Sequence, residues 1–467
     1  MSAAVTHSQQ FPFSAPVTVA VDDTSPFQRL GFNVLLVFVF LIFSRIFDVK
    51  FGNLHITGIA YRVVFAMVLL SRGFQVALSS NIGKAMLGFT ICFGVSVPFS
   101  IWRSGSMDIF QNQWLLFCFV AYLSVAGLVH NYAQWFKLFK TVAFALLIFT
   151  IISNVFGISD NGRLFLEHGK FGNPNEMAQA LLLGLPLWAA TMLMSKSLAG
   201  KAFAAGAMVL ILVTTFRTGS RGAMIGFVAM LLVVFLRAPV LGKLKIVIAG
   251  VVFLGLVFTT MPGRLIARYK TVADEEVDDS GEMGADMAAS AISSTQSRKM
   301  LLRHSLIFTI RHPLFGVGPG MFVVADDTYM KELGFRKGTW LGTHNSYTQV
   351  SSELGIPAFL FFVSAIALAL KGPYSIYQRT RGDPRLEDIG NAALALHYCL
   401  IIYAVTILFE HIAYTIMLPV FAGLAACLVR TAEVEIQRIQ SVPLPVSMSP
   451  AAFHDYLAHR PALGQPG

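Results

Sequence analysis

The sequence predicts an all-α protein that crosses a membrane many times. Hydrophobic residues make up 55% of the 467 residues and charged residues only 13%, whereas soluble domains carry about 25% charged residues. The mean hydropathy is +0.66. Apolar runs recur along the chain at lengths near the ~20 residues that cross a bilayer core. We therefore expect a polytopic membrane protein with about twelve transmembrane helices and one large loop that contains short helices.

The expected spans are apolar segments separated by short charged connectors. Arg62 and Arg72 interrupt the second segment, and the seventh and eighth are short. The first 28 residues contain no Lys or Arg, so a cleavable signal peptide is not expected and the first segment should remain as a helix. The twelve segments are 31–47, 57–78, 83–101, 113–130, 138–157, 177–194, 202–216, 222–237, 243–262, 354–370, 391–408 and 411–429.

The positive charges of the short connectors predict the orientation, because cytoplasmic connectors are enriched in Lys and Arg. With the N-terminus inside, the inner connectors hold Lys84, Lys137, Lys140, Lys196, Lys201, Arg237, Lys243, Lys245, Lys371, Arg379, Arg381 and Arg385. The outer connectors then hold only Lys50, Arg103, Arg163, Lys170, Arg217 and Arg221. Both termini are thus expected to be cytoplasmic.

This orientation divides the chain into five regions. We expect a cytoplasmic tail at 1–30, spans one to nine in 31–262, a large outer loop at 263–345, spans ten to twelve in 346–430 and a second cytoplasmic tail at 431–467. The last tail is rich in Pro and Ala after Val442.

Other uses of charge and cysteine are not supported. The net charge is +10, but the basic residues flank the spans instead of forming a basic helix or an aromatic-interleaved patch, so no nucleic-acid partner is expected. Cys92, Cys118, Cys399 and Cys427 all lie in apolar segments without metal-ligand spacing. They are expected to be small buried side chains, with no disulfide framework.

The large loop changes character along its length. An acidic stretch from Asp274 to Asp286 has no EF-hand spacing, so a solvated, mobile segment is favoured over a calcium site. A helical pattern runs from Ser297 to Ile310 before Pro313 and the glycines that follow stop it. No strand precedes Gly316–Gly320, so these residues are expected to form a sharp turn and not a dinucleotide-binding loop.

Arginines at the expected outer surface are the first candidates for a binding site. Arg217 and Arg221 lie in a very short outer connector with no acidic residue to pair with. Such arginines usually face a cavity or a partner, and the guanidinium binds phosphate oxygens in a bidentate way. We expect anion binding at Arg221 above all, and snorkelling to headgroups is the alternative. On the loop helix, Arg298 could head a polar face, whereas Arg303 is expected to be solvated unless it lines the pocket.

His344 is the candidate general base. It precedes the tenth span at the outer surface, and a neutral imidazole can accept a proton near neutral pH. His168, His304, His312 and His411 have less in their surroundings to indicate catalysis. Asn345, Asn173 and Asn175 could contact a polar ligand, although helix capping would also explain the asparagines.

These motifs together resemble the O-antigen ligase and O-antigen polymerase superfamily of bacterial envelope glycosyltransferases. The resemblance covers about 170–360, and Ala358 departs from the small or polar residue more usual there. The matching motifs are Gly172-Asn173-Pro174-Asn175, Gly219-Ser220-Arg221-Gly222, Arg298, His312-Pro313-Leu314-Phe315-Gly316-Val317-Gly318-Pro319-Gly320, His344-Asn345 and Gly355.

The resemblance implies a metal-independent, inverting glycosyltransferase of the bacterial inner membrane with its active site, and the large loop, on the periplasmic face. The donor would be a glycan on a polyprenyl pyrophosphate, and the acceptor either the lipid A–core or another lipid-linked glycan. Arg221 and Arg298 correspond to the phosphate-binding arginines and His344 to the proposed base. No cofactor or metal is expected, and membrane lipids are the remaining partners. A secondary transporter or flippase is the alternative function, and the residues do not separate ligase from polymerase.

Overall fold

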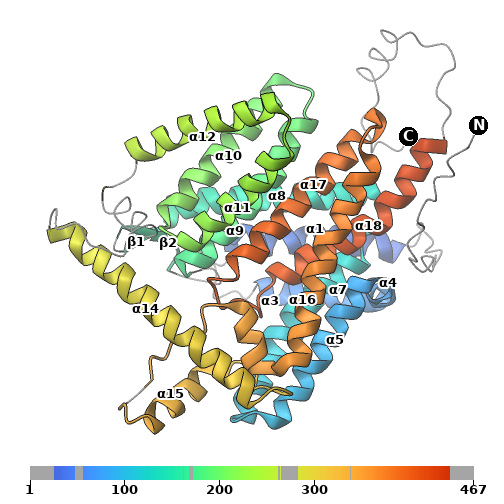
Figure 1. Ribbon diagram of the computed structural model, residues 1–467. Coiled ribbons are helices and arrows are strands. Elements are labelled where there is room, and N and C mark those ends of the chain that lie inside the picture. Colours follow the sequence, from blue (N-terminus) through green and yellow to red (C-terminus); the bar gives the residue numbers. More distant parts are fainter. Residues whose placement is uncertain are drawn as a thin grey trace, which may run out of the picture.

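The structure is a computed structural model, and it describes residues 26–47, 56–160, 162–167, 172–260, 263, 282–336 and 338–441. The described residues up to Phe156 are almost entirely helical (Figure 1). Its helices are α1 (Pro26–Ser44), α3 (Ile56–Leu70), α4 (Gly73–Ser79), α5 (Asn81–Ser96), η2 (Val97–Phe99), α6 (Arg103–Asp108), the π-helix η3 (Ile109–Phe119), α7 (Val120–Gly127) and α8 (Tyr132–Phe156).

A short antiparallel hairpin and further helices follow. The hairpin pairs Ser159 with Leu164 between α8 and α9. The elements are β1 (Ile158–Asp160), β2 (Arg163–Phe165), α9 (Pro174–Met194), α10 (Leu198–Arg217), α11 (Arg221–Arg237), α12 (Val240–Thr260), α14 (Glu282–Arg311), α15 (Phe322–Glu332), α16 (Ser346–Thr380), η4 (Pro384–Leu386), α17 (Glu387–Thr406) and α18 (Met417–Ser441).

The described residues of each of the twelve expected segments are largely helical, which confirms the all-α class. Within the described residues, nine helices are long and apolar enough to cross a membrane, or ten if the bent pair α3 and α4 forms one span. The bend of 83° lies at Arg72, one of the arginines that interrupt this segment in the sequence. α11 and α12 are not among these candidates, so a count of twelve spans stays a prediction.

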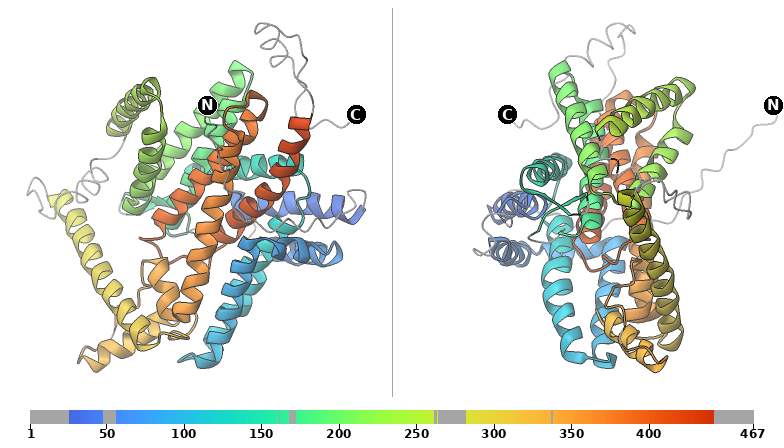
Figure 2. Two further views of the ribbon diagram at one scale, coloured as in Figure 1. Left: turned by 45° about the vertical axis from the view of Figure 1, so that its right-hand side comes forward. Right: turned by 90° about the vertical axis from the view of Figure 1, so that its left-hand side faces the viewer.

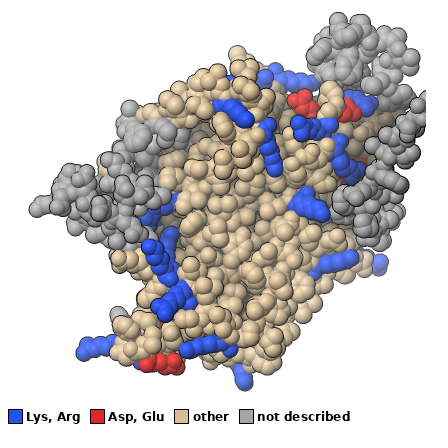
Figure 3. Space-filling view, viewed as in Figure 1, with Lys and Arg blue, Asp and Glu red and all other residues tan. Residues whose placement is uncertain are grey.

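Large apolar side chains cover much of the outer surface. Leu198 is 83% exposed and Val240 is 85% exposed, on α10 and α12. Figure 3 shows one face on which Lys and Arg lie mostly toward the edges around a broad uncharged area. A soluble protein rarely exposes so large an apolar surface, so this surface fits contact with lipid.

Small residues allow the helices of the core to approach closely. A Cβ at Gly127 of α7 would lie 2.3 Å from the carbonyl oxygen of Gly73 on α4. A Cβ at Gly423 of α18 would lie 2.9 Å from the side chain of Val125 on α7. Helix pairs in membranes commonly use such residues, because lipid supplies no hydrophobic drive for association.

The helices of the large loop differ from the expectation of short helices. α14 has 30 residues and begins at Glu282, so the end of the acidic stretch is helical. Its N-terminal half is rich in Ala and Met, which favour helix without a regular apolar pattern. The rest of the acidic stretch, Asp274 to Asp279, and His168 lie outside the described residues. α15, which the sequence did not predict, lies beside the C-terminal end of α14 (Figures 1 and 2).

α14 and α15 enclose a second, smaller core. Its members come from both helices and from the turn between them: Leu301, Phe308, Val317, Met321, Phe322 and Ala325. Beside this cluster, Nδ1 of His304 lies 2.6 Å from Oδ1 of the fully buried Asp326. His304 is thus part of the packing between the two helices.

The glycine-containing turn after α14 packs against a break in α16. Gly355 has φ 85° and ψ 174°, so α16 consists of two helical pieces joined there. Val317 N donates to Ser352 O (2.9 Å) and Gly318 N to Glu353 O (2.9 Å), while Ile356 N donates to Pro313 O (2.7 Å). The glycines therefore form a sharp turn, as expected, and this turn fixes the first piece of α16.

Candidate functional site

The segment between α17 and α18 is the centre of the candidate site. Residues 407–416 are not a regular helix, although the last span was expected to begin at 411. The first residue of α16 bonds to three residues of this segment: Ser346 N donates to Ile407 O (2.8 Å), and Ser346 Oγ donates to Glu410 O (2.7 Å) and accepts from Ile412 N (3.0 Å). These bonds hold His411 beside His344.

His344 and His411 form a pair of partly buried imidazoles whose Nδ1 atoms are buried. Their ring centroids are 5.1 Å apart and the rings are nearly perpendicular (89°). Among the described residues, neither Nδ1 atom has a hydrogen-bond partner. The backbone of His344 has φ 50°, an uncommon conformation that concentrates at functional sites. The pair presents ring nitrogens that can accept protons.

The surroundings keep His344 neutral. Burial above all, and then the neighbouring His411 and Arg298, lower its pKa from 6.5 to about 4. Burial and Arg298 also lower the pKa of His411. Both imidazoles are therefore unprotonated at pH 7, the form that a general base requires.

Arg298, a predicted site residue, carries a charge that acts on both histidines. It lies on α14, one turn before the fully buried Leu301, and is itself partly buried. Thr309, on the same helix, bonds through Oγ1 to Ser351 Oγ of α16 (2.8 Å). α14 thus lies along α16 and brings Arg298 near the imidazole pair.

The turn between α10 and α11 reaches the same segment from another side. A Cβ at Gly222 would lie 2.9 Å from the Phe409 side chain, so only a glycine after Arg221 permits this approach. Arg221 is the first residue of α11, whose N-cap Ser220 accepts from Ala223 N. A helix N-terminus and a guanidinium at one place favour an anion.

Arg217 and Arg163 hold the surrounding loops. Arg217 Nη1 donates to Asn154 Oδ1 of α8 (2.7 Å), so it is bound to an amide. Arg163 Nε donates to Thr218 O (2.9 Å) and its Nη2 donates to Asn175 Oδ1 (2.7 Å). In the sequence, Arg163 stands out only as a positive charge in an outer connector. In the structure, it links the hairpin to the α10–α11 turn and to the start of α9.

Glu410 was missed by the sequence reasoning. It is only 3% exposed. Its pKa is raised to about 8, mainly by burial and also by Glu176, although Arg298 and Arg163 act in the opposite direction. At pH 7 its carboxyl group is therefore neutral. The pattern that could have identified it is a Glu-His pair at the junction of two apolar segments, where ionisable residues are expensive and often functional.

The predicted asparagines are helix caps in the structure. Asn173 Oδ1 accepts from Asn175 N (2.9 Å) at the start of α9. Asn345 Oδ1 accepts from Tyr347 N (3.0 Å) and from Thr348 N (3.1 Å) at the start of α16. Arg303 is exposed on α14. Any contact of these residues with a ligand stays a prediction.

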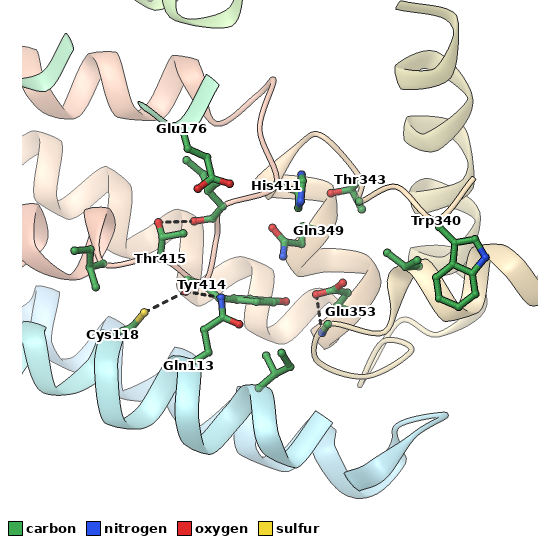
Figure 4. A pocket seen from close by; sticks show the side chains of 16 residues that line it. Gln113, Cys118, Glu176, Trp340, Thr343, Gln349, Glu353, His411, Tyr414 and Thr415 are labelled. Atoms are coloured by element: carbon green, nitrogen blue, oxygen red, sulfur yellow. Dashed lines mark hydrogen bonds between the residues drawn. The ribbon is translucent and has the colours of Figure 1, made fainter. Parts of the chain in front are cut away.

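A cavity of about 450 Å³ lies next to the imidazole pair (Figure 4). His411 forms part of its wall, together with residues of the π-helix η3, of the segment 340–343 and of the first piece of α16. The lining residues are Ile109, Gln113, Cys118, Glu176, Gly320, Val323, Trp340, Gly342, Thr343, Gln349, Glu353, His411, Ile412, Tyr414, Thr415 and Ile416.

One comparison with known families matches part of the chain, and the match includes some of the predicted site residues. Residues 206–363 match a family model described as O-antigen ligase, and this region contains Arg217, Arg221, Arg298 and His344. No curated protein matches the chain in sequence. The chain is a polytopic α-helical membrane protein, and this match supports its resemblance to the O-antigen ligase and polymerase superfamily over α10 to α16.

Proposed function

We propose that the protein is an inner-membrane glycosyltransferase that moves a glycan from a polyprenyl-pyrophosphate carrier to an acceptor hydroxyl at the periplasmic face. The observation that carries the proposal is the position of Arg298 beside two partly buried imidazoles, outside the candidate spans, where burial and Arg298 lower the pKa of both rings. Together they supply a fixed positive charge for a leaving phosphate and a base for a hydroxyl group.

Arg221 and Arg298 are assigned to the pyrophosphate of the donor. A guanidinium keeps its charge at every working pH and pairs with phosphate oxygens. When the bond between the anomeric carbon and the pyrophosphate oxygen breaks, negative charge grows on that oxygen, and nearby cations stabilise it. Arg217 is bound to Asn154, so we assign it a secondary contact. No step requires a metal ion.

His344 is assigned as the general base. A ring nitrogen takes the proton of the acceptor hydroxyl while the oxygen attacks the anomeric carbon from the side opposite the pyrophosphate, which inverts the configuration. In the free protein, a pKa of about 4 makes His344 a weak base. The donor anion would offset the charge of Arg298, one of the causes of this low pKa, and so strengthen the base once the donor is bound.

A chain-length analysis of the envelope glycan tests this function. Cells that lack the protein should accumulate glycan on the polyprenyl carrier, and His344→Ala should reproduce the defect although the variant protein inserts normally. Full-length chains that stay unattached indicate a ligase, whereas single repeat units indicate a polymerase. Failure to take up a solute, without lipid-linked glycan, would instead indicate a transporter and contradict the proposal.

A further inference from the structure

The charge of the 450 Å³ cavity differs from that expected of a pyrophosphate site. Two carboxyl groups, Glu176 and Glu353, line it, and none of the described residues that line it is Lys or Arg. A pyrophosphate group needs cations beside it, and this lining supplies none. The cavity is nevertheless next to the imidazole pair, because His411 belongs to both. The lining therefore suits a second, uncharged reactant better than a pyrophosphate.

Its polar groups are held in fixed orientations. Glu353 Oε2 accepts from Gly320 N (3.0 Å) and its Oε1 accepts from Phe322 N (3.2 Å). Gln349 Oε1 accepts from Ala413 N (3.2 Å), and Gln113 Nε2 donates to Tyr414 O (3.3 Å). Planar carboxylate and amide groups offer paired donors and acceptors, which suit the adjacent hydroxyl groups of a sugar ring.

Trp340 adds an aromatic surface at the mouth of the cavity (Figure 4). It is 60% exposed, and its backbone has φ 54°, which is rare for a bulky residue and is found at ligand clamps. An exposed indole next to polar groups can cover the apolar face of a sugar while its N–H still reaches a partner.

The opposite wall comes from an unusual helix. Ile109, Gln113 and Cys118 line the cavity and belong to η3, an 11-residue π-helix. Their spacings of four and five residues match the wider turn of a π-helix, so the three side chains lie on one face. π-Helical turns are rare and frequently mark functional sites.

We infer that this cavity binds the acceptor as a neutral saccharide end, with Trp340 against the sugar face and Gln113, Gln349 and Glu353 on its hydroxyl groups. Its volume is at the small end of the range of ligand pockets, about 300–1,000 Å³, so it holds the terminal sugars of a glycan and not the whole chain. The hydroxyl that faces His411 is then next to His344. The assignment of this sugar as the acceptor rests on the proposed function.

Saccharide binding to the purified full-length protein in detergent tests the inference without any need for turnover. The probe is the oligosaccharide repeat released by mild acid from the envelope polysaccharide of the producing cells, and binding is followed by tryptophan fluorescence and by calorimetry. Trp340→Ala should raise the Kd by about tenfold or more, as loss of a central aromatic contact does. Gln113→Ala should weaken binding as well, which guards against a fluorescence artefact of losing the indole.

Two controls separate this inference from the proposed function. Trp102→Ala removes another exposed indole, 56% exposed and outside the cavity lining, and should leave the Kd unchanged. A short-chain polyprenyl pyrophosphate should bind Trp340→Ala as it binds the wild type, whereas Arg298→Ala should lose this ligand and keep the saccharide. If both Trp340→Ala and Gln113→Ala bind the saccharide normally, the inference is overturned. If the wild type binds the saccharide but no polyprenyl pyrophosphate, the proposed function fails and the cavity assignment stands.

Discussion

The substitution Gly355→Ala tests the claim that the break in α16 at this residue is needed to position the candidate site. Gly355 has φ 85° and ψ 174°, a combination that only glycine adopts readily. A Cβ there would lie 2.3 Å from Leu314 O, 2.4 Å from Leu314 C and 2.8 Å from Phe315 N. All three neighbours are backbone atoms, so no side-chain rotation can relieve the clash.

The free-energy cost of Gly355→Ala to the folded state has two parts that can be separated. The backbone conformation alone costs a residue with a Cβ about 1–3 kcal/mol. The clash requires the main chain to move, which puts at risk the three backbone hydrogen bonds between 313–318 and 352–356, each with a net value of about 0.5–1.5 kcal/mol. The sum is roughly 3–7 kcal/mol. Gly334→Ala is the matched control, because Gly334 has φ 88° and a Cβ there would meet nothing within 4 Å.

Thermal unfolding of the detergent-purified proteins measures this difference. We expect Gly355→Ala to lower the apparent Tm more than Gly334→Ala, and to reduce glycan transfer because the start of α16 positions both histidines. Equal losses of Tm in the two variants would show that backbone strain alone matters. The close packing of the turn against Gly355 would then be refuted.

Three further predictions concern the charged groups around the site. Arg298→Ala should raise the donor KM by roughly 30-fold, since a charge-assisted hydrogen bond contributes about 2 kcal/mol. Arg311→Ala, at the C-terminal end of α14, should leave the donor KM unchanged. Equal effects of the two substitutions would contradict the assignment of Arg298 to the donor. Glu410 becomes negatively charged as the pH rises through about 8, and it then competes with the donor pyrophosphate for Arg298. The donor KM should therefore increase above this pH, and Glu410→Gln should abolish the increase. If the variant keeps the wild-type pH profile, Glu410 is excluded as its cause. Asp326→Ala leaves the buried ring of His304 without its partner and should destabilise the protein by about 1–3 kcal/mol, whereas an unchanged Tm would show that this pair does not hold α15 to α14.

The sequence predicts the all-α class well because each helix depends on a local run of apolar residues. Apolar runs of sufficient length specify helices in lipid wherever they occur, and every expected segment is largely helical. Segment ends were less predictable: residues 407–416 are mostly apolar apart from Glu410 and His411, yet they are not helical. Their bonds to Ser346, a residue about 60 positions earlier, are what hold them, and no local pattern records such a contact.

The residues of the candidate site are likewise of two kinds: those that the sequence identifies and those that only the packing of the helices identifies. Residues with unusual chemistry for their position, such as Arg298 and His344, stand out in the sequence, and the structure brings them together. His411 and Glu410 belong to the same cluster, but their roles depend on the packing of α14, α16 and α17. The three asparagines show a different limit of sequence-based prediction. An asparagine at the start of a helix can be a cap or a ligand contact, and the sequence does not distinguish the two roles.

Transfer by the purified protein in proteoliposomes tests the central claim most directly. The donor is a polyprenyl-pyrophosphate-linked glycan, and both its consumption and the growth of the acceptor are followed. We predict that the wild type consumes donor only when acceptor is present, that His344→Ala still binds donor but transfers no glycan, and that Arg298→Ala binds donor poorly. Transfer by a correctly inserted His344→Ala protein at the wild-type rate would contradict the account.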